Sequence, residues 1–438
     1  MPLSTQPYKG ARDFYPEDKR IQKYMFSKMR TAVERFGYEE YDAPIIENLE
    51  IYKAKSGEEI VNDQTYTFTD RGGREVAIRP EMTPTVSRMV AARRQELCYP
   101  LRLYSIPNLW RYERPQRGRL REHWQLNVDL FGDSAISAEH ETILVADAML
   151  KEFGATRSMY TININSRKLM DFIMIDFLGL NLDQVHALSK LIDRMHKMDK
   201  SLFVSQVHDA LTAEQKDAGL SHKIIDVLAV TSLNDLPDHV KESEAAKTLK
   251  ELMDILADSG VSNAKFDITI MRGFDYYTDV VFEVYDTDPT NSRSMFGGGR
   301  YDGLVGLFGV DPVPTIGFGC GDVTLQNFLE AHNLIPEIQN DIDIYAILIG
   351  EEYKRSLKLL ATLRSEGLNV AVDNSQRKLS SQLKNATKKG ITYVLFIGDK
   401  ELEEERYNLK NLVTGEEQTL SPERIISYVL DQRHTAKR

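Results

Sequence analysis

The sequence predicts an α+β protein in which a strand-rich core is interrupted by a block of helices and followed by a small α/β domain. Three features of the 438 residues support this fold class. Short apolar runs separated by glycine and proline turns fill residues 38–131, helical periodicity fills residues 166–260, and strands alternate with helices from Asp341 onward. At roughly 150 residues per domain, a chain of this length holds about three units.

The strand-rich part opens with a helix expected over residues 17–36, ended by Gly37. Its apolar side chains share one face: Ile21, Met25, Met29, Ala32, Val33 and Phe36. The turn at residues 70–73 (DRGG) lies between two strand-like segments and predicts a hairpin. Ser137 is expected to cap a further helix that runs to Phe153.

After the helical block, strands are expected at residues 265–272 and 279–285, followed by a glycine-rich turn at residues 296–300. The alternating tail predicts strands at residues 343–350, 369–374 and 391–398, with helices at 351–366 and 378–389. Such alternation is typical of a mostly parallel sheet covered on both faces. Residues 341–438 carry a net charge of +1 and the rest of the chain −12, so the tail is also electrostatically distinct.

Composition excludes several classes of protein. A net charge of −11 argues against coating nucleic acid by bulk charge, although a local basic patch could still bind RNA. No apolar run reaches the roughly 18–20 residues of a membrane span, and the first residues lack a secretory signal. Cys98 and Cys320 are too few for a disulfide framework or a four-ligand zinc site, and the nine histidines lack metal-ligand spacing. We expect a soluble, cytoplasmic protein without a membrane partner.

The densest chemical signal is an arginine-rich segment. From Arg102 to Arg121 there are six arginines, no lysine and one acid, Glu113. The planar guanidinium suits bidentate binding of phosphates or carboxylates and stacking on bases. Strand-like flanks place these residues on a hairpin whose tip can move. A merely charged surface hairpin is the alternative, and the absence of lysine argues against it.

Three other segments are candidates for a site. Glu81 and Thr83 would share a face of an extended segment and could grip an ammonium group, although a capping turn before a helix from Thr85 explains them as well. Residues 272–278 (RGFDYYT) suit a polar pocket with aromatic walls, or a tyrosine-rich hairpin packed on the helical block. Residues 297–303 (GGGRYDG) lack the signatures of a P-loop or dinucleotide fold, so their glycines are expected to allow close backbone approach beside a site.

Taken together and in this order, these segments resemble the class II aminoacyl-tRNA synthetases, and among them the histidyl-tRNA synthetases. GARDFYP and YDAPIIENLEIY resemble the N-terminal segment and the dimer-forming first motif, and RYERPQRGRLREHWQ resembles the second motif. RGFDYYT and GGGRYDGLV resemble the two signatures of the histidine enzymes. The tail from residue 369 resembles the anticodon-binding domain of this subgroup.

The resemblance implies an architecture and a reaction. Residues 1–165 and 261–335 would form a catalytic core on an antiparallel sheet, 166–260 a helical insertion that clamps the tRNA acceptor arm, and 341–438 an α/β anticodon-binding domain. The enzyme would be a homodimer that activates L-histidine with ATP to histidyl-adenylate and transfers the histidyl group to tRNA(His). Mg²⁺ would bridge the outer phosphates of ATP.

The resemblance also implies roles for individual residues. Arg111 would hold the α-phosphate, Glu113 and Arg119 would contact the rest of ATP, and Arg272 would stabilise charge beside the reacting phosphate. The ammonium group of histidine would be bound by Glu81, Thr83 and Gln125. The imidazole pocket would be lined by Asp129, Tyr276, Tyr277 and Tyr301. Gln116 and Arg121, near the hairpin tip, would meet the tRNA acceptor end.

Two positions depart from the family pattern, both beside the expected adenine. Thr324 stands where the third motif ends in an arginine, and His123 stands where the second motif has phenylalanine. Since threonine cannot supply charge, the sequence predicts weaker ATP binding or compensation by another cation. Asp129, where some relatives have glutamate, retains an acid in the pocket.

Two rival functions follow from the same resemblance. The first is a histidine-sensing regulatory paralogue, a subunit of ATP phosphoribosyltransferase without aminoacylation activity. Those subunits usually lack the C-terminal domain and the arginine and tyrosine signatures, which are present in this sequence. The second is a non-catalytic RNA-binding protein, which the complete set of Glu81, Arg111, Gln125 and Arg272 disfavours.

Overall fold

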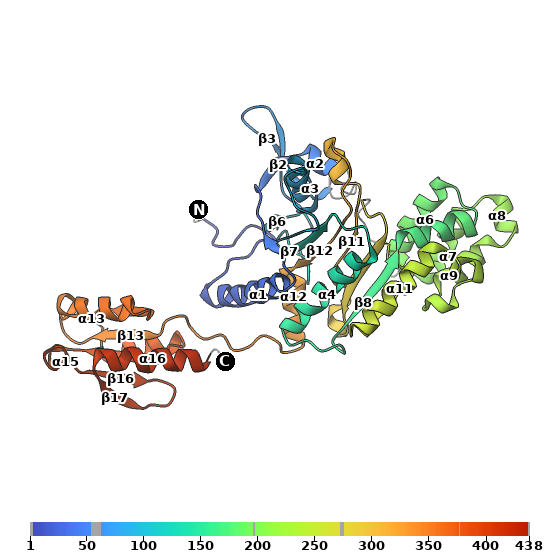
Figure 1. The fold of residues 1–438 in the computed structure, drawn as a ribbon. Helices are drawn as coiled ribbons and strands as arrows, with labels where there is room; N and C mark the ends of the chain where they lie inside the picture. Colours follow the sequence, from blue (N-terminus) through green and yellow to red (C-terminus); the bar gives the residue numbers. More distant parts are fainter. Residues whose placement is uncertain (1–2, 54–62, 196–197, 272–275, 376, 437–438) are drawn as a thin grey trace. The chain divides into compact units, whose positions relative to one another are not determined.

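The computed structural model describes residues 3–53, 63–195, 198–271, 276–375 and 377–436. They form two compact units, Met1–Pro336 and Glu337–Arg438. The first unit contains the strand-rich core and the helical block, and the second is the alternating tail (Figure 1).

The first unit is built on a nine-stranded sheet in the order β1-β5-β7-β12-β11-β10-β8-β9, with β6 paired to β7. The strands are β1 Glu39–Glu40, β5 Leu101–Ser105, β6 Asn108–Trp110, β7 Glu122–Phe131, β8 Tyr160–Ser166, β9 Ala264–Phe266, β10 Val280–Asp286, β11 Ser294–Arg300 and β12 Thr315–Gly321. Within the described part of this sheet, only the edge pairs β1–β5 and β8–β9 are parallel. The predicted α+β core on an antiparallel sheet is therefore confirmed.

Helices pack beside this sheet, and their apolar faces explain why (Figure 1). They are α1 Pro16–Glu34, α3 Thr83–Ala92, α4 Ile136–Glu152 and α12 Asp322–Ala331. In α1, Met25, Met29 and Val33 are fully buried at helical spacing, and Gly37 adopts φ +80° just beyond the helix. A smaller sheet orders β2 Ile46–Asn48, β4 Glu75–Ile78 and β3 Tyr66–Thr69, beside α2 Glu50–Lys53. Strands β3 and β4 form the predicted hairpin.

The expected cap of α4 was wrong. Ala135 is the N-cap, and Ser137 lies inside the first turn. The Asp133 carboxylate accepts from the Ala135 backbone N–H at 2.8 Å and from the Ser137 hydroxyl at 3.1 Å. The Ser137 hydroxyl therefore donates to an acid before the helix and does not cap the backbone N–H groups of the first turn.

Two expectations around the glycine-rich segment were also wrong. Residues 296–300 form part of strand β11 and not a turn, because their glycines pair across the sheet with those of β12. The strand expected over 265–272 is only three residues long, β9. The Asp267 carboxylate accepts from both the backbone N–H and the hydroxyl of Thr269, which turns the chain out of the sheet.

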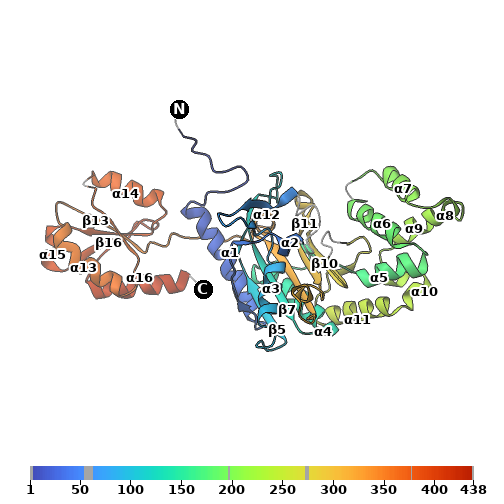
Figure 2. The same cartoon turned by 90° about the horizontal axis from the view of Figure 1, so that it is seen from above.

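The described residues between 167 and 258 are mostly helical, as predicted. The elements are α5 Arg167–Asp171, the π-helix Phe172–Phe177, α6 Leu182–Arg194, α7 Lys200–Asp209, α8 Ala213–Asp217, α9 Leu220–Leu228, α10 Asp238–Lys241 and α11 Glu244–Asp258. Figure 2 shows α6 to α9 gathered beside one another at the end of the first unit. In α11, Leu249, Leu252 and Leu256 are buried in the cluster that also contains the sheet residues of the core, so this helix joins the block to the sheet.

The second unit is an α/β domain with its own core. Its sheet has the order β14-β13-β15-β16-β17, with strands β13 Ile344–Leu348, β14 Val370–Asp373, β15 Tyr393–Ile397, β16 Tyr407–Asn411 and β17 Glu417–Leu420. The helices are α13 Tyr353–Ser365, α14 Leu379–Lys388, α15 Asp399–Glu404 and α16 Pro422–Ala436. The first three strands are parallel, as predicted, whereas β16 and β17 add an antiparallel edge that the pattern did not reveal.

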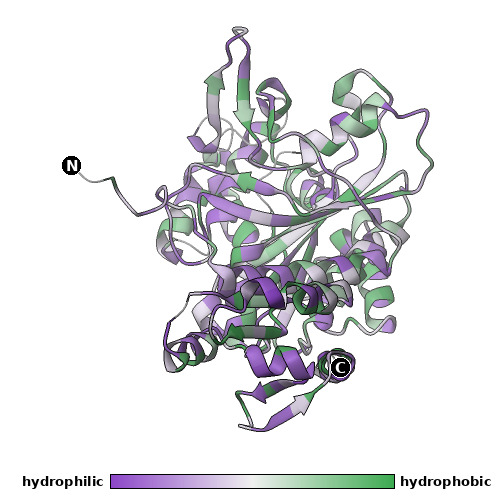
Figure 3. Cartoon of the chain, turned by 90° about the vertical axis from the view of Figure 1, so that its left-hand side faces the viewer, coloured by the Kyte–Doolittle hydropathy of each residue, from purple (hydrophilic) through white to green (hydrophobic). Residues whose placement is uncertain are grey.

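The helices of the chain carry both hydrophobic and hydrophilic residues along their length (Figure 3). Within the described ranges, none has the length and apolar character needed to cross a membrane.

Candidate functional site

The floor of the site is made of glycines on β12, which pairs with β7 in the sheet. Gly317 lies opposite Asp129, and Gly319 lies opposite Asn127. A Cβ atom at Gly317 would lie 2.4 Å from Asp129 Oδ1, and one at Gly319 would lie 2.4 Å from Gln125 Nε2. Because these positions carry no side chain, the side chains of β7 can lie across the neighbouring strand.

A small pocket of about 90 Å³ opens above this floor. All seven residues predicted to bind histidine line it: Glu81, Thr83, Gln125, Asp129, Tyr276, Tyr277 and Tyr301. Helix α3 begins at Thr83, two residues earlier than expected, so Glu81 and Thr83 reach the pocket from a helix start and not from an extended segment. Arg111 and Asn127 also line the pocket.

Asp129 places an unpaired acceptor in this pocket. Its side chain is buried, and the Tyr301 hydroxyl donates to Oδ1. In the described part of the chain, Oδ2 is buried without a hydrogen-bond partner. Burial raises the pKa of Asp129 to about 7, against the lowering effect of the Tyr301 hydrogen bond. A buried acceptor of this kind is well placed to accept a hydrogen bond from a ligand.

Three tyrosines form the walls of the pocket. The ring centroids of Tyr276 and Tyr277 are 4.8 Å apart, and those of Tyr276 and Tyr301 are 5.5 Å apart. The Tyr276 hydroxyl donates to Glu81 Oε2 at 3.2 Å, and Glu81 is buried. Burial, followed by the charge of Asp129, holds the pKa of Tyr301 well above its ordinary value, so its hydroxyl remains a donor. The pocket therefore suits a small, flat, polar ligand that carries a positive group.

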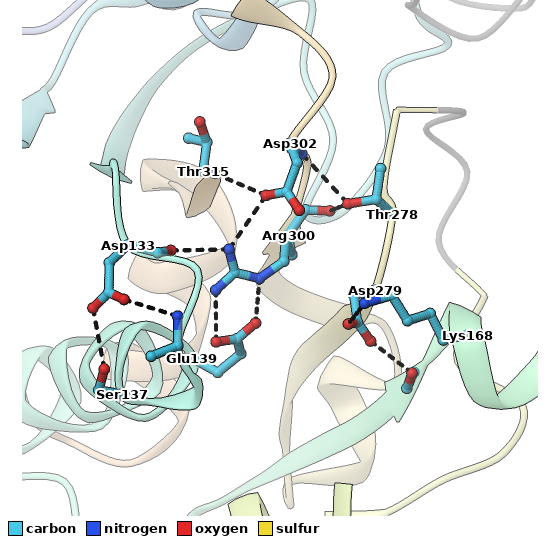
Figure 4. A network of polar contacts seen from close by, with 11 residues as sticks. Asp133, Ser137, Glu139, Lys168, Thr278, Asp279, Arg300, Asp302 and Thr315 are labelled. Carbon is cyan, nitrogen blue, oxygen red and sulfur yellow. Dashed lines mark hydrogen bonds and ion pairs between the residues drawn. The ribbon is translucent and has the colours of Figure 1, made fainter. Parts of the chain in front are cut away.

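A buried ion pair fixes the position of Tyr301 (Figure 4). The preceding residue, Arg300, donates to both carboxylate oxygens of Glu139 on α4, with 2.7 Å between Nη2 and Oε2. Its Nη1 also donates to the Asp133 carbonyl at 3.0 Å and to Asp302 at 3.2 Å. Because both members of the pair are buried, removal of one would leave an uncompensated charge.

A larger cavity of about 1000 Å³ adjoins the small pocket, and Arg111 lines both. Arg111 Nε donates to the Pro80 carbonyl at 2.9 Å. Among the described residues, no carboxylate forms an ion pair with Arg111. In the same cavity Arg119 pairs with Glu113 at 2.7 Å. Arg111 thus places an uncompensated guanidinium at the boundary between the two sites.

The two positions that depart from the family pattern also line the larger cavity. Burial lowers the pKa of His123 to about 3, with further lowering by Arg111 and Arg12, so the imidazole is neutral at physiological pH. The Thr324 hydroxyl donates to the Met295 carbonyl at 2.7 Å. Thr324 therefore contributes packing to the cavity but no charge.

The remaining predicted residues differ in position. Gln116 lines the larger cavity and accepts from Arg293 Nη2 at 3.0 Å. Arg121 does not lie near the hairpin tip as expected. It is buried at the base of the hairpin, where it stacks 3.9 Å from the Tyr112 ring centroid and donates to the Glu113 carbonyl at 3.1 Å. Arg272 lies outside the described residues.

Sequence reasoning missed one ion pair beside the site. Arg12 Nη2 lies 2.7 Å from Asp322 Oδ2, and the other Asp322 oxygen accepts from the Trp124 backbone N–H at 3.0 Å. Asp322 is buried at the first turn of α12. The two residues are 310 positions apart, so no local spacing could have linked them.

Comparison with known proteins agrees with this geometry. A family model described as Histidyl-tRNA synthetase matches residues 10–321. The chain belongs to this family. A model described as Anticodon binding domain matches residues 343–432, which confirms the expectation for the tail.

Individual members of the family match nearly the whole chain. A histidine–tRNA ligase of Leptospira biflexa is 44% identical over 421 residues, which cover 96% of this chain and 96% of that protein. A histidine–tRNA ligase of Thermoplasma volcanium is 37% identical over 421 residues, which cover 96% and 97%. The crystal structure of histidyl-tRNA synthetase from Nostoc superposes with a TM-score of 0.79 and covers 98% of this chain and all of that one. At 21% identity, that likeness concerns the fold.

Proposed function

We propose that this chain activates L-histidine with ATP and transfers the histidyl group to tRNA(His). One observation supports this function above all: Arg111 lines both the small acid-and-tyrosine pocket and the larger arginine-lined cavity. An amino acid in the first and a nucleotide in the second would bring a carboxylate and an α-phosphate together at one guanidinium. Membership of the histidyl-tRNA synthetase family supports the same assignment.

In the small pocket, Asp129 Oδ2 would accept the N–H of the substrate imidazole, and the tyrosine rings would enclose it. The ammonium group would be bound by Glu81, Thr83 and Gln125. Gln125 Nε2 donates to Asn127 Oδ1 at 2.6 Å, which orients the amide so that Oε1 is its remaining acceptor. A wrong side chain would leave Asp129 buried and unpaired, which supports strong discrimination.

The activation step needs positioning more than proton transfer. The histidine carboxylate, already ionised at neutral pH, attacks the α-phosphorus, forming one O–P bond as the bond to the pyrophosphate oxygen breaks. Arg111 would stabilise the charge on the α-phosphate oxygens. Arg272 would stand beside the same phosphate, a role carried over from the family motif alone.

The larger cavity would hold ATP, with Arg119 and Glu113 contacting the nucleotide and the neutral His123 against adenine. Among the described residues, no cluster of three histidine, cysteine or acidic side chains could hold a metal by itself. Mg²⁺ is usually held by one or two carboxylates together with substrate phosphates, so single acids suit it. Glu113 and Glu283, which line the cavity, would be its protein ligands, and the ion would neutralise charge on the outer phosphates.

The rest of the chain would serve tRNA and assembly. Residues 1–165 and 261–335 would form the catalytic core, 166–260 the insertion that clamps the acceptor arm, and 341–438 the anticodon-binding domain. Gln116 would meet the acceptor end, whereas the buried position of Arg121 removes it from that role. We further propose a cytoplasmic homodimer; the exposure of Ile45 (53%) and Ile46 (50%) in the first motif supports an apolar interface there.

Histidine-dependent exchange between ATP and pyrophosphate tests this function, followed by charging of tRNA(His) transcripts. We expect exchange that requires histidine, and charging that requires both substrates. Absence of exchange at any ATP concentration, with histidine still bound, would instead support the regulatory paralogue. The complete pocket and the anticodon-binding domain disfavour that alternative.

A further inference from the structure

We infer that Arg293 is a further ATP-binding residue, whose guanidinium binds the outer phosphates together with Arg119. This inference rests on the proposed function. Arg293 directly precedes β11 and lines the same cavity as Arg111, Arg119 and Thr324. Arg293 lies outside the segments that resemble the family motifs.

The charge of Arg293 is not compensated. Within the described ranges it forms no ion pair, and its hydrogen bond goes to a neutral acceptor, Gln116 Oε1, at 3.0 Å. Arg119 in contrast already pairs with Glu113. An exposed guanidinium held by an amide can turn to a phosphate at little cost, since charge-assisted hydrogen bonds are about twice as strong as neutral ones.

Within the described residues, none of the acids that line the cavity forms an ion pair with Arg111 or Arg293. Glu283 accepts from the Tyr285 hydroxyl, and Asp267 accepts from Thr269 and Asn163. In the described part of the chain, two guanidiniums of the cavity therefore lack a carboxylate partner, those of Arg111 and Arg293. Arg111, at the boundary with the amino-acid pocket, suits the α-phosphate. Arg293 suits the outer phosphates of a triphosphate.

The contacts of Thr324 place it beside the segment that carries Arg293. The Thr324 hydroxyl donates to the carbonyl of Met295, two residues after Arg293. A Cβ atom at Gly118 of the arginine hairpin would lie 3.5 Å from Thr324 Cγ2, which is contact distance. The short side chain at 324 thus lets the hairpin tip approach α12, while the neighbouring segment before β11 supplies the cation.

The chain offers a matched control on the same hairpin. Arg117 also binds a neutral amide, with Nε and Nη2 at 3.2 and 3.1 Å from Asn291 Oδ1. Like Arg293, it joins the hairpin tip to the segment before β11, but it does not line the cavity. Arg293→Gln and Arg117→Gln therefore each remove one arginine–amide contact, and only the first removes a cation from the nucleotide site.

The test compares the binding of ATP with that of AMP by equilibrium titration, alongside the Michaelis constants for ATP and histidine in the exchange assay. We expect Arg293→Gln to weaken ATP binding at least tenfold, with AMP and histidine changed less than twofold, and Arg293→Lys to recover part of the loss. Arg117→Gln should leave all of these values within twofold.

Three results would overturn the inference: unchanged ATP binding, equal weakening of ATP and AMP, or a loss confined to tRNA charging, which would assign Arg293 to the nucleic acid. Failure of the proposed function itself would look different. The unmodified protein would then bind ATP but give no histidine-dependent exchange.

Discussion

Asp129→Asn is the most informative single change in this protein, because it alters charge and hydrogen bonding with almost no change in shape. The Tyr301 hydroxyl donates to Asp129 Oδ1, so asparagine would keep its carbonyl oxygen there and turn its amide nitrogen into the pocket. The position of Oδ2, now a buried acceptor without a partner in the described part of the chain, would become a donor. It would face the N–H of the substrate imidazole.

The magnitude of the loss follows from that contact. A hydrogen bond to a charged group contributes about 1.5–3 kcal/mol, and opposing two donors adds the cost of an unsatisfied group. We expect histidine binding to weaken by about 2–3 kcal/mol, a factor of roughly 30–150. Titration of histidine by calorimetry and the Michaelis constant for histidine in the exchange assay measure the effect. Histidine affinity within threefold of the unmodified protein would refute the assignment of Asp129 to the imidazole.

The same variant makes a second, opposite prediction for stability. Burial raises the pKa of Asp129 from 3.8 to about 7, so the folded state disfavours the ionised form by about 4 kcal/mol. The favourable contribution of the neutral carboxyl is complete below pH 3.8 and is lost as pH rises through about 7. Asparagine does not ionise, so Asp129→Asn should raise the midpoint of thermal unfolding more at pH 8 than at pH 5. An equal change at both pH values would contradict a raised pKa.

Three further predictions concern the surroundings of the site. Gly317→Ala places a Cβ atom 2.4 Å from Asp129 Oδ1 and should weaken histidine binding at least tenfold. Gly303→Ala is the control, because its Cβ atom would meet no atom within 4 Å and histidine binding should not change. Equal effects of the two substitutions would show that close approach at Gly317 does not matter. Arg121→Ala should slow exchange and tRNA charging by similar factors, because the residue stacks inside the hairpin base, and a loss of charging alone would instead assign it to tRNA. Arg12→Ala leaves Asp322 buried without its ion pair, so the midpoint of thermal unfolding should fall, more at pH 8 than at pH 5. The fall should be smaller when Asp322→Asn is already present. If the two substitutions lowered the midpoint additively, the two side chains would not be coupled.

Much of the fold could be predicted from local patterns, because helical periodicity and turn residues act over short distances. The helical block, the hairpin at residues 70–73 and the strand–helix alternation of the tail follow from such patterns. The glycine-rich strand β11 could not, since glycine is typical of turns and its strand pairing depends on the glycines of β12. The same limit applies to the start of α4, where Asp133, two residues before the N-cap, accepts from the Ser137 hydroxyl that was expected to cap the helix.

The candidate site shows a similar division. The seven residues predicted to bind histidine, which come from separate motifs, all line one pocket. They do not reveal how the second motif packs, so Arg121 was expected at the hairpin tip although Tyr112 and the Glu113 carbonyl hold it at the base. Arg293 belongs to no motif, and its proximity to Gln116 depends on the contact between the hairpin and the segment before β11.

The glycine floor has a consequence for how substrate choice can change in this protein. At Gly317 and Gly319 the smallest possible addition, one methyl group, would meet an atom at 2.4 Å, so neither position offers a graded series of substitutions. The floor cannot be raised or tilted stepwise by point mutation. Gradual adaptation to another amino acid therefore has to change the opposite wall of the pocket. There, substitution of Tyr276 or Tyr277 can remove either the hydroxyl alone or the whole ring. Libraries for altered substrates are best placed at these two tyrosines, with the strand beneath them left unchanged.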